Sequence, residues 1–199
     1  MDCIKVGKLI SDLRREKQMT QKTLADAMNI SDRTISKWER GRGCPDVSLL
    51  GELSQILEVD IEQLLSGELE PNTRGGNMKR IKFYVCATCG NVLFGLSEAT
   101  VSCCGRKLSP LHTNADIENH EVLVEEIEDD YFISMNHAMT KAHYISFAAC
   151  VFYDSVLLVK LYPEQNAEVR IPKLHGNHSN KVYIYCTEHG LLEKTVRSA

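Results

Sequence analysis

The sequence lacks the long apolar segments that membrane and secreted proteins carry. A membrane helix needs about 18 or more consecutive apolar residues, and no run in these 199 residues approaches that length. The N-terminal stretch MDCIKVGKLISDLRRE has neither the apolar core nor the small-residue cleavage site of a signal peptide. Long repeats and low-complexity tracts are also missing. We therefore expect a globular, cytoplasmic protein with no membrane partner.

An overall basic charge is lacking too, because the net charge is -4 at pH 7. The charges are unevenly distributed, however. Residues 1–45 hold 10 Lys and Arg against 6 Asp and Glu, whereas residues 46–70 hold 7 acids and no base. Only the N-terminal part therefore has the excess of positive charge that favours contact with phosphate groups.

Cysteine, in contrast, is abundant. Eight cysteines are many for a protein of a reducing compartment unless they bind metal, because thiols do not form lasting disulfides there. Five of them fall into two clusters with metal-ligand spacing, which are described below. The remaining three, Cys3, Cys44 and Cys150, we expect to be free thiols, with Cys150 in the core of a strand.

The texture of the sequence changes after about residue 67. Apolar periodicity predicts helices over residues 4–16, 21–28, 32–40, 46–57 and 60–66, with Ser31 and Asp46 as N-caps. Beyond an acidic, Pro- and Gly-containing stretch, runs such as KFYVC, VLFGL, HYISFAACVFY and KVYIYC are rich in β-branched and aromatic residues. The pattern predicts an all-helical first part, a flexible linker over residues 68–79 and an all-β second part.

The stretch TQKTLADAMNISDRTISKWERG has the pattern of two short helices that meet at a steep angle. Ala25 is small enough for the helices to approach, and Asn29 tolerates the left-handed backbone conformation that the turn requires. With SKWERG followed by PD, residues 4–66 resemble the Cro/C1 (XRE) family of helix-turn-helix DNA-binding domains.

This resemblance implies that residues 31–40 form a recognition helix in the major groove of double-stranded DNA, and that the protein binds as a homodimer to a pseudo-palindrome. Arg33 can contact guanine with two hydrogen bonds, Lys37 can contact guanine or phosphate, and Asp32 either accepts from cytosine or orients Arg33. The alternative is a helix-turn-helix used for protein contact. The full set of DNA-contact candidates is Gln21, Ser31, Asp32, Arg33, Ser36, Lys37 and Arg40.

A first cysteine cluster occurs in CATCGNVLFGLSEATVSCCG, with Cys86, Cys89, Cys103 and Cys104. Four thiolates at this spacing can close a tetrahedral zinc or iron site. Adjacent residues on a strand point to opposite faces, so a turn at Gly105 is needed to bring Cys103 and Cys104 together. Residues 82–111 resemble the desulforedoxin module, which implies an iron-tetrathiolate site, with zinc as the alternative.

A second constellation lies downstream in ENHEV, NHAMTKAHYI and YCTEHG. Four imidazoles and one thiolate suit Fe(II), and a thiolate opposite a vacant position pushes electron density toward whatever binds there. Residues 115–195 resemble the superoxide reductase domain of desulfoferrodoxin and neelaredoxin, which implies a seven-stranded immunoglobulin-like sandwich. The resemblance implies equatorial ligands at His120, His137, His143 and His189, an axial thiolate at Cys186, and a sixth-position carboxylate at Glu118.

These features together predict a multidomain chain. Its parts are a helix-turn-helix domain at residues 1–67, a linker at 68–79, a rubredoxin-like four-cysteine metal module at 80–112 and a superoxide reductase-like iron domain at 113–199. The expected activity is reduction of superoxide to hydrogen peroxide, with Glu118, His120 and Cys186 in catalytic roles and electrons from a donor such as a rubredoxin-like protein.

Two departures from the family pattern favour alternatives. The family usually has lysine before the first histidine, and here the residue is Asn119; a lost positive charge slows capture of an anion. Ala138 replaces a proline. The chain can therefore be a transcription regulator whose iron senses superoxide, oxygen or iron supply with little turnover, or a DNA-binding protein that holds only zinc.

Overall fold

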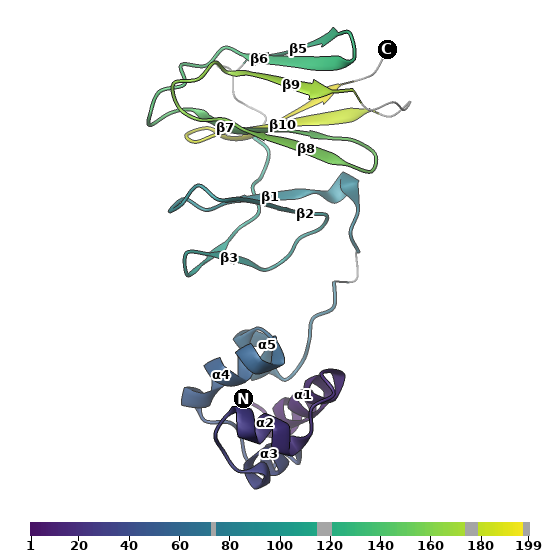
Figure 1. Ribbon diagram of the computed structural model, residues 1–199, viewed down its shortest axis with the longest axis vertical. Helices are drawn as coiled ribbons and strands as arrows, with labels where there is room; N and C mark the ends of the chain where they lie inside the picture. The colour runs from purple at the N-terminus through teal and green to yellow at the C-terminus, as the bar shows by residue number, and fades with distance from the viewer. Residues whose placement is uncertain (73–74, 115–120, 174–178, 197–199) are drawn as a thin grey trace. The chain divides into compact units, whose positions relative to one another are not determined.

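A computed structural model describes residues 1–72, 75–114, 121–173 and 179–196, and its chain forms two compact units, residues 1–73 and 74–199 (Figure 1). The first unit contains only α-helices, and the second contains short β-strands and one turn of 3-10 helix. The predicted fold class, a helical domain followed by a β-rich region, is confirmed. Among the described residues no helix is both long and apolar enough to cross a bilayer.

The five helices of the first unit are α1 (Cys3–Glu16), α2 (Gln21–Ala27), α3 (Asp32–Glu39), α4 (Val47–Leu57) and α5 (Ile61–Ser66). Each begins after a residue whose side-chain oxygen accepts from backbone N–H groups of the first turn. The caps are Asp2, Thr20, Ser31, Asp46 and Asp60. Local capping thus fixes where each helix begins, as the sequence predicts for Ser31 and Asp46.

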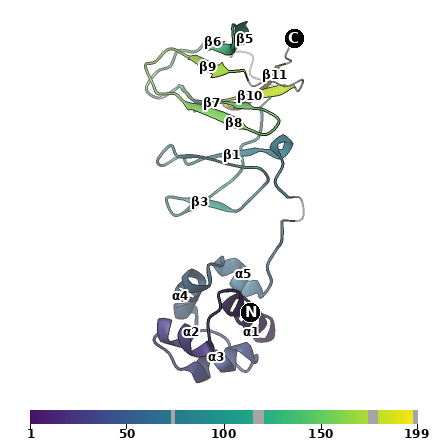
Figure 2. The same ribbon diagram turned by 45° about the vertical axis from the view of Figure 1, so that its right-hand side comes forward.

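Tight packing sets the angle between the helices. Asn29 has φ 51°, the left-handed conformation expected at the turn between α2 and α3. Gly7 lies where α1 crosses the end of α3, and a Cβ atom there would stand 1.9 Å from the carbonyl oxygen of Trp38. Leu24, Ile35 and Trp38 are buried in a single core with residues of α1, α4 and α5. Figure 2 shows α2 and α3 lying beside one another in this bundle.

In its described residues, the second unit begins with η1 (Met78–Arg80) and continues with strands and their connections. They are β1 (Lys82–Val85), β2 (Val92–Gly95), β3 (Val101–Cys103), β4 (Arg106–Leu108), β5 (Val122–Ile127), β6 (Asp130–Met135), β7 (Ile145–Val151), β8 (Val156–Lys160), β9 (Glu168–Pro172), β10 (Asn180–Cys186) and β11 (Gly190–Val196). Strands β5–β6–β9 form one sheet and β11–β10–β7–β8 another, and both are antiparallel. These seven strands form the predicted sandwich (Figure 1).

Two hydrophobic clusters hold this unit together. The first lies between the two sheets and includes Tyr131, Ile133, Ala148 and Cys150. The second lies on the other face of the larger sheet, where Phe83 of β1 packs on Phe147 and Tyr183 with ring centroids 5.4 and 5.2 Å apart. The hairpin β1–β2, which leads into the first cysteine cluster, is therefore packed against the sandwich rather than attached only through the chain.

The structure corrects one prediction about the thiols. Cys3 and Cys44, predicted to be free, form a disulfide with Cα atoms 5.0 Å apart. The reason is that the first turn of α1 packs against the segment that follows α3: the Cβ position of Gly41 would lie 2.8 Å from the side chain of Ile4. Cys150 is a free, fully buried thiol on β7, as expected.

Candidate metal centres and nucleic-acid interface

The histidine and cysteine constellation gathers at one end of the sandwich. Cys186 is the last residue of β10, and His189 follows it after a turn that ends at Gly190, where φ is 82°. His137 and His143 lie on the loop that joins β6 to β7. Because this segment is a loop, the two imidazoles lie on one side through the course of the backbone and not through the alternation of side chains along a strand. Cys186 is fully buried, and the three histidines are half-buried.

The ligand atoms of these four residues converge. Nε2 of His143 lies 2.9 Å from Nε2 of His137, 3.1 Å from Nδ1 of His189 and 3.1 Å from Sγ of Cys186. Sγ of Cys186 lies 3.5 Å from Nε2 of His137 and 3.4 Å from Nδ1 of His189. A neutral imidazole nitrogen is either one donor or one acceptor, so hydrogen bonding alone does not account for three partners around His143.

A shared metal ion does account for them. With metal–nitrogen bonds of about 2.1 Å, two nitrogens are roughly 3.0 Å apart if they meet at a right angle and roughly 3.4 Å apart in a tetrahedron. The nitrogen pairs at 2.9 and 3.1 Å fit the right angle. The donor set of imidazoles and one buried thiolate therefore fits a metal ion.

Two residues that the sequence interpretation missed support this site. Thr187 joins the two loops: its hydroxyl donates to the carbonyl of Ala142 and accepts from the backbone N–H of Tyr144. The carboxylate of Glu188 lies 3.8 Å from Nδ1 of His143, on the opposite edge of the ring from the converging nitrogens. Carboxylates commonly orient metal-binding histidines from this side. The C-x2-H motif predicts a role only for Cys186 and His189, the residues at its two ends, and not for the two residues between them.

Two further predicted site residues, Glu118 and His120, lie outside the described residues, as does Asn119. The described part of the site therefore consists of His137, His143, Cys186 and His189.

The four clustered cysteines also come together. Sγ of Cys103 lies 3.5 Å from Sγ of Cys89 and 4.0 Å from Sγ of Cys104. Together with the sulfur of Cys86, these three sulfurs form one group. Metal–sulfur bonds of about 2.3 Å place sulfurs roughly 3.8 Å apart in a tetrahedron, so these separations suit a tetrathiolate site. The expected turn is present, because Cys104 and Gly105 both have positive φ and form the two-residue connection between β3 and β4.

The surroundings of the sulfurs change their acidity. Backbone N–H groups of Cys89 and Thr88 point at Cys86 and lower the pKa of its thiol to about 6. The neighbouring sulfurs of Cys89 and Cys86 raise the pKa of Cys104 to about 12. One thiol of this cluster ionises easily, and its neighbours then resist further negative charge. A bound cation would stabilise the thiolates of such a cluster.

The proposed recognition helix presents an exposed polar face. Ser31, Asp32, Arg33, Lys37 and Arg40 are exposed, and Ser36 is half-buried. The carboxylate of Asp32 accepts from the backbone N–H of Arg33, and Nε of Arg40 donates to the carbonyl of Ser36. Arg33 and Lys37 are thus one turn apart on the exposed face of α3.

Gln21 is placed differently from the other DNA-contact candidates, since its amide donates to Glu39 at 2.7 Å. Glu39 in turn accepts two hydrogen bonds from Arg14, from Nε at 2.6 Å and from Nη2 at 3.1 Å. Only 9% of the Arg14 side chain and 7% of the Glu39 side chain are exposed. This buried network ties the end of α3 to α1 and α2.

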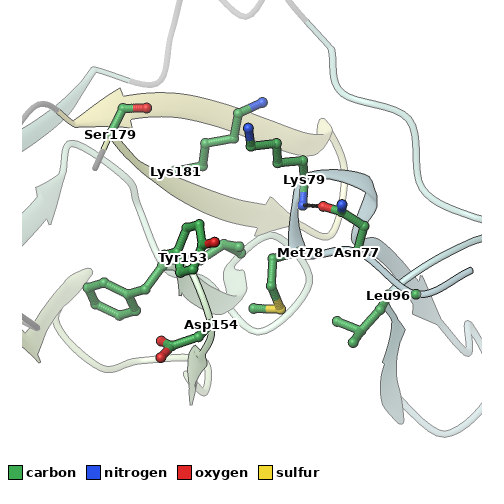
Figure 3. A pocket seen from close by; sticks show the side chains of 11 residues that line it. Asn77, Met78, Lys79, Leu96, Tyr153, Asp154, Ser179 and Lys181 are labelled. Carbon is green, nitrogen blue, oxygen red and sulfur yellow. Dashed lines mark hydrogen bonds between the residues drawn. The ribbon is translucent and has the colours of Figure 1, made fainter. Parts of the chain in front are cut away.

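A cavity of about 960 Å³ lies elsewhere in the second unit, between η1, the β7–β8 turn and the start of β10 (Figure 3). Its lining includes Lys79, Lys181, Asp154 and the apolar side chains of Met78 and Leu96. Lys181 is paired with Glu193. None of the ligand candidates among the described residues lines this cavity, so it is separate from both metal-site candidates.

Comparison with known proteins supports the division into two functional parts. A helix-turn-helix family model matches residues 10–64. The HTH-type transcriptional activator BcrR of Enterococcus faecalis is 38% identical over 80 residues, which cover 38% of this chain and 39% of that protein. The ImmF control region 10 kDa protein of Bacillus phage phi105 is 32% identical over 76 residues, covering 38% of this chain and 84% of that protein. The chain spans about two fifths of the length of the first of these relatives.

The second unit resembles a solved structure instead. The superoxide reductase of Treponema pallidum superposes with a TM-score of 0.51 at 20% identity, covering 58% of this chain and 97% of that one. At this identity the likeness concerns the fold. The chain thus belongs to the Cro/C1-type helix-turn-helix family through its N-terminal unit, and it carries behind that unit a domain with the superoxide reductase fold.

Proposed function

We propose that this protein is a DNA-binding regulator that reduces superoxide at an iron site in its second unit. The observation that carries the proposal is the close approach of the His143 nitrogen and the Cys186 sulfur to each other and to a nitrogen of His137 and of His189, at 2.9–3.5 Å. The domain limits proposed from the sequence, with a four-cysteine metal module at 80–112 and an iron domain from 113 onward, are part of this proposal.

The DNA-binding part rests on the family match and on the exposed face of α3. We infer that Arg33 and Lys37 read or contact the major groove, and that Gln21, because its amide holds Glu39, acts through the position of α3. A single module of this size buries too little surface for tight operator binding, which supports a homodimer on a two-fold site.

The reductase part rests on the donor set. Ferrous iron, when bound, supplies the single electron that converts superoxide and two protons into hydrogen peroxide. Cys186 would supply a buried thiolate that raises electron density at a bound metal, and His137, His143 and His189 would supply imidazole nitrogens, which suit Fe(II). Thr187 keeps the two ligand loops at a fixed separation. Electrons would come from an external donor such as a rubredoxin-like protein.

The test is a superoxide pulse applied to anaerobic, iron-loaded protein while the thiolate-to-iron absorption is followed. We expect rapid oxidation, release of peroxide and recovery when reductant is added. Cys186→Ser should abolish the absorption band, whereas Cys150→Ala, which changes the other buried cysteine of the sandwich, should keep it. A wild-type site that binds iron but is not oxidised by the superoxide pulse, with no release of peroxide, would overturn the reductase proposal.

A second candidate function is sensing, and Asn119 favours it. Without a lysine at this position, superoxide capture loses a local positive charge, which changes association rates by one or more orders of magnitude. A slow site can still report oxidation to the DNA-binding unit. Asn119→Lys should then raise the rate of reaction with superoxide at least tenfold. An unchanged rate would remove the reason for preferring sensing over turnover.

A further inference from the structure

The Cys3–Cys44 disulfide stands apart from the other cysteines. Four free cysteines belong to the tetrathiolate group, Cys186 lies among the histidines, and Cys150 is completely buried. Cys3 and Cys44 are both half-buried and have no metal-binding partner among the described residues. They are thus a pair of thiols that solvent species can reach and that no cofactor needs.

Their position joins the start of the unit to the end of its recognition helix. Cys3 is the first residue of α1, and Cys44 lies between α3 and α4, only five residues after Glu39 ends α3. The sequence separation is 41, so the bond closes a loop that contains α1, α2 and α3. The backbone N–H of Arg42 donates to the carbonyl of Lys37, and that of Gly41 to Trp38, so the segment that Cys44 holds also caps α3.

We propose that Cys3 and Cys44 are a reversible, peroxide-sensitive thiol pair whose oxidation fixes the C-terminal end of recognition helix α3. In a reducing compartment, where the sequence predicts this protein to work, disulfides are usually transient and redox-sensing. The domain core, which includes Leu24, Ile35 and Trp38, contains neither of the two cysteines. We therefore expect the reduced unit to stay folded, with less stability and with a freer segment after α3.

The oxidant is hydrogen peroxide, and the chemistry balances. One thiolate attacks a peroxide oxygen, the O–O bond breaks, and the sulfur becomes a sulfenic acid while hydroxide leaves as water. The second thiol then displaces the sulfenic hydroxyl as a second water and forms the S–S bond. Two thiols are oxidised and one peroxide is reduced to two waters. The local source of peroxide rests on the proposed reductase function, although the thiol pair itself does not.

The experiment uses the full-length, reduced protein in the absence of oxygen. Peroxide is added, thiols are alkylated and mapped by mass spectrometry, and the helical unit is melted by far-ultraviolet circular dichroism. We expect Cys3 and Cys44 to become protected together and the melting midpoint of the helical unit to rise by roughly 10 °C or more. Binding to a selected DNA site should tighten several-fold. The Cys44→Ser variant should show none of these changes, and Cys150→Ala should show all of them.

Two outcomes would overturn the thiol pair. In the first, Cys3 and Cys44 stay alkylatable after peroxide treatment or are over-oxidised without pairing. In the second, they pair but leave both the melting midpoint and DNA affinity unchanged.

A separate arm supplies superoxide and an electron donor instead of peroxide. Because superoxide also disproportionates to peroxide in water, the Cys186→Ser variant is the control. Pairing that catalase prevents, and that is faster in the wild type than in Cys186→Ser, supports peroxide produced by the protein. If added peroxide pairs the thiols equally well in both proteins but superoxide with donor pairs them no faster in the wild type, the thiol pair stands and the reductase proposal fails.

Discussion

The buried ion pair between Arg14 and Glu39 provides the sharpest test of how the recognition helix is held. Glu39→Gln keeps the volume of the side chain but leaves the Arg14 guanidinium buried without its counter-charge. Breaking such a pair costs about 3–5 kcal/mol. The free energy of unfolding of a small domain is about 5–15 kcal/mol in total, so this one substitution should remove a large part of the stability of the helical unit.

The matched control is Glu58→Gln, which neutralises the partner of Lys17 in a pair at 2.8 Å whose carboxylate is 79% exposed. An exposed pair contributes about 0.2–1 kcal/mol. The assay is urea unfolding followed by circular dichroism at the helical signal, which in the described chain comes from the first unit apart from the one turn η1. If the two variants lose equal stability, the buried network does not hold α3 as argued. Replacing Arg14 by Met in the Glu39→Gln background should recover stability, because no uncompensated charge remains.

The remaining predictions concern pH, packing, DNA and metal. Burial raises the pKa of Glu39, but hydrogen bonds from Arg14 and Gln21 outweigh burial, and the pKa is lowered overall. The stability that the ionised Glu39 contributes is therefore present above its unfolded-state pKa and is lost as the pH falls through its folded-state pKa. Acid unfolding of the wild type, compared with that of Glu39→Gln, checks this prediction. Gly7→Ala should cost about 1–3 kcal/mol or more in urea unfolding, because its Cβ would meet a backbone oxygen, whereas Gly51→Ala on the exposed face of α4 should be neutral or stabilising. Arg33→Ala should weaken binding to a selected site by about 1–3 kcal/mol in titrations and relax one base preference, whereas Arg170→Ala on β9 should not. Cys103→Ser should lower the metal content of the four-cysteine site measured after anaerobic purification, and retention of the full metal content would contradict a tetrathiolate site.

Local signals in the sequence predict most of the fold. The caps at Ser31 and Asp46, the left-handed turn at Asn29 and the β-rich runs act over a few residues, and the structure contains all of them. The spacing C-x2-C followed by C-C also predicts that four sulfurs can meet, because the needed turn at Gly105 is short and local.

Contacts between distant segments could not be predicted in this way. Cys3 and Cys44 are 41 residues apart, and only the packing of α1 against the end of α3 brings them together. Gln21 and Glu39 are 18 residues apart, so the amide that the helix-turn-helix pattern assigns to DNA has an unforeseen partner. Glu188 approaches His143 across loops that are 45 residues apart in the chain. Each of these contacts depends on how distant segments pack, and no local sequence pattern predicts that packing.

The position of Cys186 gives the histidine site two halves that the backbone holds differently. Its strand, β10, is flanked on both sides by β7 and β11, so the sulfur is attached to a fully hydrogen-bonded ladder, whereas the imidazoles stand on connecting loops. If a metal ion binds here, its exchange should therefore begin on the imidazole side, with the sulfur as the last point of attachment and the first to be reoccupied.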